Sequence, residues 1–262
     1  MRLPLFGLLD RWRAPAPDPR KVTWVGQQDY AHRGLHGAGV PENSLAAFRA
    51  AIDGGLGIEL DVQRAADGQA VVFHDADLSR LTCRSDKVSR LTAAELGRIA
   101  LEGTGETIPT LREALRLIDG RVPVLIEIKT RRHENVSALC LAVRRVLEGY
   151  VAPHAVIGFD PRVCRWYRRF SPYTVRGLTI TEGEDRAFPG AIRRHLALWH
   201  ARPHFLAYDV RDLPSRFAGA QRARGFPVVA WTVADAGHRE RSALHADADI
   251  AEGEGFAVGG SA

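Results

Sequence analysis

The chain has 262 residues, of which 45% are hydrophobic and 26% charged, a composition typical of a folded protein rather than a disordered one. A single α/β barrel takes about 250 residues, so one domain is the simplest interpretation of this length. Lysine and arginine number 36 against 31 aspartate and glutamate residues, and the resulting net charge of +5 favours anionic partners in general. The sequence contains no dense basic run, so nucleic acid is not a predicted partner.

The three cysteines, Cys83, Cys140 and Cys164, are widely spaced and form no CxxC pair. This spacing predicts neither a disulfide framework nor a thiolate zinc site, and a reducing cytoplasm fits it best. Residues 3–9 are apolar, but Asp10 interrupts them, and the stretch is too short for a signal peptide. We therefore expect a cytoplasmic protein, with peripheral membrane attachment through this short stretch as an alternative.

Residues 1–25 are predicted to form an N-terminal arm, because the prolines at positions 15, 17 and 19 disfavour helix, and residues 26–262 to form a single domain. From Tyr30 onward, short apolar runs alternate with longer helical stretches. Predicted strands span residues 30–32, 58–62, 122–128, 155–159, 175–180, 205–210, 228–233 and 248–251. Predicted helices span residues 44–52, 111–118, 135–147, 162–170, 191–200, 215–224 and 236–244.

Repeated βα units of this kind predict parallel strands joined by right-handed crossovers, and eight of them predict a (β/α)8 TIM barrel. The short stretch after residue 252 predicts that the last helix is truncated or missing. That gap, beside an arginine-rich outer surface, would allow a dimer contact.

Residues 63–108 interrupt the alternation and are predicted to be a small insertion that covers the open end of the barrel. Asp67-Gly68 is a hairpin signal, and a two-residue turn there would place His74 opposite Asp61. His74 would thereby return to the mouth of the barrel. Thr92 and Glu95 have the spacing of a capping box, which predicts a helix start within the insertion.

Reactive groups of a βα barrel lie at the carboxyl ends of its strands, and polar residues stand at several of these ends. The first predicted strand ends in His32-Arg33-Gly34, the second carries Glu59-Leu60-Asp61, and the third carries Glu127 and Lys129. Alternation along a strand puts Glu59 and Asp61 on one face. Because like charges repel there, a divalent cation bound by Glu59, Asp61 and Glu127 is the economical interpretation.

Oxygen ligands of this kind suit Mg²⁺ or Ca²⁺, and the sequence does not choose between them. Arg33 could hold a phosphate oxygen through two hydrogen bonds, and His32 and His74 have the side chain for general acid–base catalysis. Each residue also has a structural alternative: an isolated histidine is usually structural, the ExD pattern is common, and Glu127 with Lys129 could be a buried ion pair. His36 is interpreted as a solvated loop residue.

Together these segments resemble the glycerophosphodiester phosphodiesterase family, in order and spacing, from about residue 31 to residue 252. The matching segments are His32-Arg33-Gly34, Pro41-Glu42-Asn43-Ser44, Glu59-Leu60-Asp61-Val62, Asp67-Gly68, residues 71–75, Ile108-Pro109-Thr110-Leu111, residues 126–129 and, more loosely, residues 229–233. Ser44 stands where the family commonly has threonine.

The resemblance implies a barrel enzyme that hydrolyses glycerophosphodiesters to glycerol 3-phosphate and an alcohol. It also implies roles for single residues. His32 and His74 match the acid and base, Glu59, Asp61 and Glu127 match the ligands of a divalent cation, Arg33 and Lys129 match phosphate-contacting positions, and Trp231 matches an aromatic wall beside the glycerol.

Two other functions remain open from the sequence. The same site could act on lysophospholipids at membranes, as a lysophospholipase D-type hydrolase, with the N-terminal arm as the membrane contact. Alternatively, the barrel could bind phosphate without catalysis, although two proton carriers argue against a mere binder.

Overall fold

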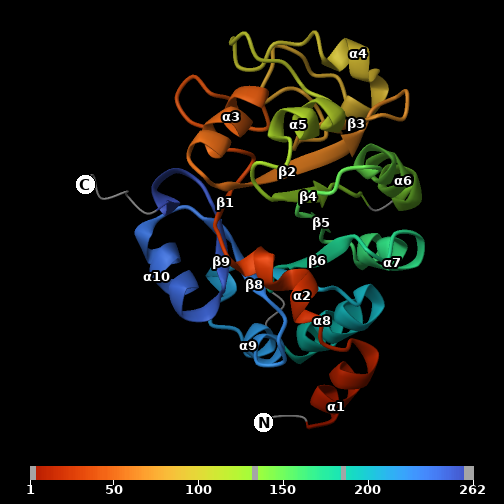
Figure 1. Ribbon diagram of the computed structural model, residues 1–262, viewed down its shortest axis with the longest axis vertical. Coiled ribbons are helices and arrows are strands. Elements are labelled where there is room, and N and C mark those ends of the chain that lie inside the picture. Colours follow the sequence, from red (N-terminus) through yellow and green to blue (C-terminus); the bar gives the residue numbers. More distant parts are fainter. Residues whose placement is uncertain (1–3, 132–134, 184–186, 257–262) are drawn as a thin grey trace. The chain divides into compact units, whose positions relative to one another are not determined.

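The computed structural model describes residues 4–131, 135–183 and 187–256. The chain divides into two compact units, one formed by residues 30–154 and the other by residues 1–29 and 155–262. The first unit contains the strands β1 (Tyr30–Ala31), β2 (Gly57–Arg64), β3 (Ala70–Val72) and β4 (Val124–Ile128). Its helices are α3 (Leu45–Asp53), α4 (Ala93–Leu96), α5 (Leu111–Ile118) and α6 (Val136–Leu147), with a 3-10 turn, η2, at Val88–Arg90 (Figure 1).

In this unit β2 pairs in parallel with both β1 and β4, whereas β3 runs antiparallel to β2. Every residue of β4 and all but the last residue of β2 are buried. Parallel strands that are covered on both faces have this character, because their crossover helices pack on the sheet. Polar side chains on such strands therefore need hydrogen-bond or ion-pair partners inside the protein.

The helices of this unit begin where the sequence predicts, because side-chain oxygens cap them. The Ser44 hydroxyl accepts a hydrogen bond from the Ala47 N–H at the start of α3. Thr92 and Thr110 each form a capping box with the glutamate three residues later, at the starts of α4 and α5. Each such cap satisfies N–H groups that have no partner inside the helix.

The predicted hairpin register is wrong by one residue. In the structure Val62 pairs with Val72 and Arg64 with Ala70, so Phe73, and not His74, lies opposite Asp61. The loop has three residues instead of two, because the Ala65 N–H donates to the Gln69 carbonyl. Gly68, with φ +87°, occupies the left-handed position that a three-residue loop requires.

The inserted segment has a hydrophobic core of its own. Its buried side chains form one cluster, made of Ala65, Val71, Phe73, Leu78, Leu81, Val88, Ala93, Leu96, Ile99, Leu101 and Ile108. This burial holds the irregular backbone between β3 and α5 in place without long strands or helices. The segment can therefore present polar side chains on a fixed frame.

The second unit contains the parallel strands β5 (His154–Ile157), β6 (Val175–Ile180), β7 (Phe205–Asp209), β8 (Val228–Val233) and β9 (Ala248–Ala251), paired in chain order. Helices α7 (Pro161–Phe170), α8 (Phe188–Ala201), α9 (Arg216–Arg222) and α10 (Ala236–His245) alternate with them, and 3-10 turns η3 (Val210–Asp212) and η4 (Gly253–Gly255) follow β7 and β9. Gly177 on β6 is required by packing, since a Cβ there would lie 2.5 Å from the Phe205 ring.

The described residues thus contain eight parallel strands that alternate with helices, and the predicted (β/α)8 TIM-barrel class is confirmed. After β9 the described part of the chain forms only the short turn η4, and residues 257–262 lie outside the described residues. None of the helices in the described part is both long and apolar enough to span a bilayer.

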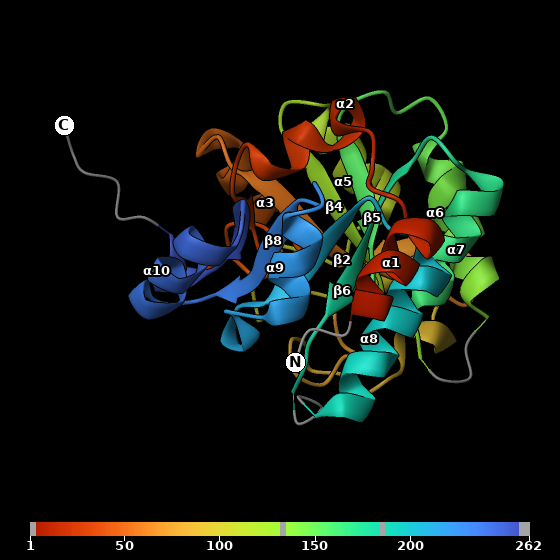
Figure 2. The same cartoon turned by 90° about the horizontal axis from the view of Figure 1, so that it is seen from below.

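The N-terminal segment contains two helices. Residues 14–18 are non-helical, as their prolines predict, but they are flanked by α1 (Pro4–Arg13) and by the short helix α2 (Pro19–Val22), which leads into η1 (Thr23–Gly26). Helix α1 lies beside α8 (Figure 2). The division into an arm of residues 1–25 and a domain of residues 26–262 stays a prediction.

Asp10 anchors α1. Its carboxylate is buried and accepts hydrogen bonds from His195, Trp199 and Gln221, at 2.9, 2.7 and 2.8 Å. Asp10→Ala is expected to lower the free energy of unfolding by about 2–4 kcal/mol, because the buried Gln221 and the partly buried His195 and Trp199 lose their acceptor. Urea denaturation checks this, with the exposed Arg11→Ala, expected within about 0.5 kcal/mol of wild type, as the control on the same helix.

Candidate active site

Three carboxylates of the first unit lie close together on neighbouring strands. Glu59 and Asp61 are on β2, and Asp61 pairs in register with Glu127 on β4. The side chains are almost fully buried, with relative exposures of 2%, 1% and 9%. One oxygen from each lies within 4.8 Å of the others. The predicted grouping of these residues is therefore present in the structure.

Lys129 compensates part of this negative charge. Its Nζ lies 2.8 Å from Asp61 Oδ1 and 2.8 Å from Glu127 Oε1. Burial alone would raise the pKa of Asp61, but Lys129 and then Arg33 outweigh it and bring that pKa to about 2. Burial lowers the pKa of Lys129, and the two carboxylates more than offset this, so the ammonium stays charged. The ion pair between Glu127 and Lys129 that the structural alternative assumes is thus present.

Glu59 is the least compensated of the three carboxylates. Burial raises its pKa well above the usual range, and Asp61 and Glu127 raise it further. Burial also raises the pKa of Glu127, against the opposing effect of Lys129. A cation coordinated by these oxygens would remove the repulsion, and an all-oxygen donor set suits a hard divalent ion. The residues present therefore fit Mg²⁺ or Ca²⁺.

Arg33 enters the site through a tight turn after β1. The residue has φ +55°, and its main-chain N–H donates to Glu59 Oε2 at 3.0 Å. Gly34 follows with φ +78°, where a Cβ would lie 2.8 Å from the Ala47 Cβ, so only glycine fits. The Arg33 guanidinium contacts Asp61 at 3.3 Å and Glu42 at 2.8 Å. Arg33 and Lys129, the two cations predicted to contact phosphate, are therefore both paired with carboxylates in this structure.

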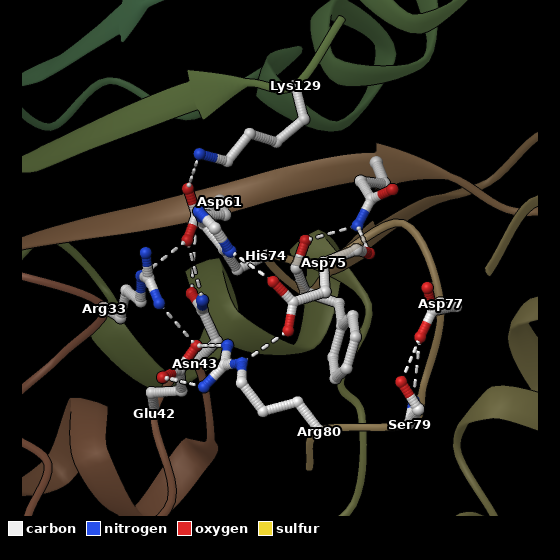
Figure 3. Close-up of polar contacts among 12 residues, drawn as sticks. Arg33, Glu42, Asn43, Asp61, His74, Asp75, Asp77, Ser79, Arg80 and Lys129 are labelled. Carbon is white, nitrogen blue, oxygen red and sulfur yellow. Dashed lines mark hydrogen bonds and ion pairs between the residues drawn. The ribbon is translucent and has the colours of Figure 1, made fainter. Parts of the chain in front are cut away.

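His74 follows β3 and is oriented by its neighbours (Figure 3). Its Nδ1 lies 2.7 Å from Asp75 Oδ1, which leaves Nε2 available for proton transfer. The buried Gln63 donates to the carbonyls of Phe73 and Asp75, at 2.8 and 2.5 Å, and so fixes the bend that carries the imidazole. Burial lowers the pKa of His74, and Lys129 and Arg33 lower it further, whereas Asp61 and Asp75 oppose them.

The other two predicted residues are placed differently. His32 directly follows β1 in the first unit and is half-buried. It is close enough to Glu127 to lower the pKa of that carboxyl group slightly, against the effect of burial. Trp231 lies on β8 of the second unit, where its ring contacts Phe159 edge-on at 5.3 Å between centroids. Seven of the eight predicted site residues thus lie in the unit of residues 30–154, and Trp231 lies in the other unit.

Sequence reasoning did not assign several polar residues that touch this set. Asn43 donates to Asp61 Oδ2 at 2.9 Å, and its own oxygen accepts from the Asp61 N–H at 3.2 Å. Glu42 and Asp75 contact Arg33 and His74, respectively, and Arg80 contacts both of these carboxylates. The signal that could have identified three of them is their position within the matched segments, which contain Glu42, Asn43 and Asp75. Arg80 lies in the insertion, where no pattern singled it out.

Comparison with known proteins supplies independent evidence. Residues 32–253 match the model of the glycerophosphoryl diester phosphodiesterase family. A Mycobacterium tuberculosis protein, "Probable glycerophosphodiester phosphodiesterase 2", is 36% identical over 233 residues, which cover 83% of this chain and 84% of that protein. A glycerophosphodiester phosphodiesterase of Bacillus altitudinis is 41% identical over 109 residues, but these cover 39% of this chain and only 44% of the relative.

Solved structures agree with these matches. A phosphodiesterase of Oleispira antarctica, determined with the product sn-glycerol-3-phosphate, superposes with a TM-score of 0.75 and 26% identity, over 86% of this chain and 92% of that one. A glycerophosphodiester phosphodiesterase of Thermotoga maritima superposes with a TM-score of 0.69 and 27% identity, over 85% and 92% of the two chains.

Proposed function

This chain belongs to the glycerophosphoryl diester phosphodiesterase family, and on that premise we propose that it hydrolyses glycerophosphodiesters to glycerol 3-phosphate and an alcohol. The observation that carries the proposal is the group of three buried carboxylates whose oxygens lie within 4.8 Å of one another. Beside it stand a histidine oriented by a carboxylate and two cationic side chains, the charge pattern that phosphoryl transfer requires.

Glu59, Asp61 and Glu127 would hold a divalent cation, Mg²⁺ or Ca²⁺. When bound, the ion would polarise a phosphate oxygen and offset negative charge in the transition state. Arg33 and Lys129, whose side chains retain 16% and 19% exposure, would bind the remaining phosphate oxygens and keep the phosphorus in line with the attacking group.

His74 and His32 would move the protons. The lowered pKa of His74 keeps its imidazole neutral near pH 7, which suits a proton acceptor at Nε2 while Asp75 holds Nδ1. His32 would then protonate the leaving alcohol oxygen. The role of Trp231 as an aromatic wall beside the glycerol stays a prediction.

A head-group panel with and without chelator tests this function. Wild-type protein is expected to release glycerol 3-phosphate from at least one of glycerophosphocholine, glycerophosphoethanolamine, glycerophosphoglycerol and glycerophosphoinositol. EDTA is expected to abolish the release, and excess Mg²⁺ or Ca²⁺ to restore it. Binding of glycerol 3-phosphate with no turnover of any diester would instead favour the phosphate-binding alternative.

Membrane contact is a second candidate, favoured by one feature of α1. Leu8 and Trp12 lie one helical turn apart with exposures of 66% and 69%, next to the exposed Arg11 and Arg13. Exposed apolar side chains beside arginines suit the surface of an anionic bilayer. The location we propose is cytoplasmic, with α1 as the contact through which lysophospholipids could be reached. A dimer stays a prediction that light scattering would test.

Vesicle co-sedimentation checks the membrane contact. With vesicles of phosphatidylcholine and phosphatidylglycerol, Leu8→Ser/Trp12→Ser is expected to reduce the bound fraction at least about threefold relative to wild type, because two strongly exposed apolar side chains of α1 are removed. Leu244→Ser, at another exposed leucine, is the matched control and should bind like wild type. Equal binding of all three proteins, or binding of none, would contradict this contact.

A further inference from the structure

Arg80 binds two carboxylates, one of which contacts His74 and the other Arg33. Its Nε donates to Asp75 Oδ2 at 2.6 Å, and its Nη1 and Nη2 donate to the two oxygens of Glu42 at 2.9 and 2.7 Å (Figure 3). The guanidinium thus makes three charge-assisted hydrogen bonds from one plane. Such forked contacts fix direction as well as distance.

Each carboxylate continues the chain of contacts. Asp75 holds Nδ1 of His74 at 2.7 Å, and Glu42 holds Nη1 of Arg33 at 2.8 Å. The order of contacts is therefore His74, Asp75, Arg80, Glu42 and Arg33, all within the unit of residues 30–154. Among the described residues Arg80 forms no hydrogen bond or ion pair with Glu59, Asp61 or Glu127, so it acts on the site through its two partners.

We propose that Arg80 is a positioning residue, which holds the imidazole of His74 and the guanidinium of Arg33 in a single mutual arrangement. The inference rests on the proposed function for the roles of those two residues. It gives the insertion a role in the site, which is to supply this arginine. Leu78 and Leu81, buried in the insertion's own core, flank Arg80 and fix the backbone from which it extends.

The residue type matters for this role. Lysine carries the same charge but has no planar fork, so it could not hold both carboxylates with the same geometry. The Arg80 side chain is 46% exposed, and exposed ion pairs contribute little to stability, typically less than about 1 kcal/mol. Arg80 is therefore expected to affect catalysis much more than folding.

Kinetics of Arg80→Ala, Arg80→Lys and Arg84→Ala test the proposal. Arg84 is the matched control, an exposed arginine of the same insertion that pairs with Asp86. Arg80→Ala is expected to lower kcat about 10–100-fold and to raise KM several-fold, because both the imidazole and the phosphate contact lose their support. Arg80→Lys should recover part of this loss, and Arg84→Ala should match wild type. Wild-type kcat and KM in Arg80→Ala would overturn the proposal.

Double variants show whether Arg80 acts through its partners. In an Asp75→Asn background, Arg80→Ala is expected to change kcat by less than about twofold, and in a Glu42→Gln background it should change KM by less than about twofold. Effects that simply multiply in both backgrounds would contradict an action through these carboxylates.

A measurement without substrate separates this inference from the proposed function. The contact with Asp75 requires a proton on Nδ1 of His74, whose ¹⁵N-NMR signal can be assigned by its loss in His74→Ala. The signal is expected to broaden or shift in Arg80→Ala and to stay unchanged in Arg84→Ala. An unchanged signal in Arg80→Ala would refute the positioning role, whereas inactive wild-type protein with the expected spectra would refute only the assigned activity.

Discussion

His74→Ala is expected to reduce kcat for a glycerophosphodiester about 10²–10⁴-fold without unfolding the protein, the usual contribution of a positioned proton carrier. His74 lies in a bend outside regular strands and is half-buried, so its removal leaves no large cavity. Release of glycerol 3-phosphate and the thermal midpoint of unfolding are the two measurements. His32→Ala should lower kcat by a similar factor.

The interpretation of His36 as a solvated loop residue is wrong, because His36 is half-buried and one of its ring nitrogens lies within 4.8 Å of a ring nitrogen of His32. The matched control is therefore His200→Ala, since His200 lies on α8 and contacts Arg165, which has no assigned role. We expect it to keep at least about half of the wild-type kcat. Full activity in either His74→Ala or His32→Ala would show that the assigned proton carriers are wrong, even if the chain proves to be a phosphodiesterase.

The lowered pKa of His74 adds a pH dependence to this prediction. Burial disfavours the imidazolium, so the neutral form that accepts a proton persists to lower pH than for an ordinary histidine. A bound divalent cation would lower this pKa further. The acid limb of kcat/KM is therefore expected below about pH 6.5, the ordinary histidine value. An acid limb clearly above that value would contradict a role for neutral His74 as the base.

Glu59→Gln is expected to stabilise the metal-free protein while it removes the response to metal. In the absence of a cation, Glu59 is a buried carboxylate beside Asp61 and Glu127, and replacing it by a neutral isostere relieves about 1–3 kcal/mol. The sign follows from the raised pKa of Glu59. The folded state binds its proton more tightly than the unfolded state, so metal-free stability falls as pH rises above about 4.5.

Thermal unfolding with EDTA and with Mg²⁺ or Ca²⁺ measures both effects. Wild-type protein should gain about 2.7 kcal/mol when the ion is present at a hundred times its Kd, whereas Glu59→Gln should gain much less. Glu148→Gln is the control, an exposed glutamate of the same unit that pairs with Arg144, and should behave like wild type. A metal response that survives in Glu59→Gln would show that the ion, if bound, uses other ligands.

From Tyr30 onward, the order and type of most strands and helices could be predicted from the sequence alone. Helix caps depend on interactions between residues that are close in the sequence. The start of α3 at Ser44 and the capping box at Thr92 could therefore be predicted from the local sequence. Strand alternation likewise put Glu59 and Asp61 on one face. Their closeness to Glu127 followed from the expectation that neighbouring parallel strands end at one edge.

Contacts between side chains that are far apart in sequence could not be predicted in this way, because they depend on how the whole chain packs. The hairpin register depended on a third loop residue, which placed Phe73 instead of His74 opposite Asp61. The bend held by Gln63 nevertheless brings His74 close to Asp61. The burial of Asp10 required donors from positions 195, 199 and 221. Arg80 reaches Glu42 across 38 positions of the chain, and no local pattern encodes that pairing. Leu78 and Leu81, which are buried in the core of the insertion, hold the backbone from which Arg80 extends to Glu42.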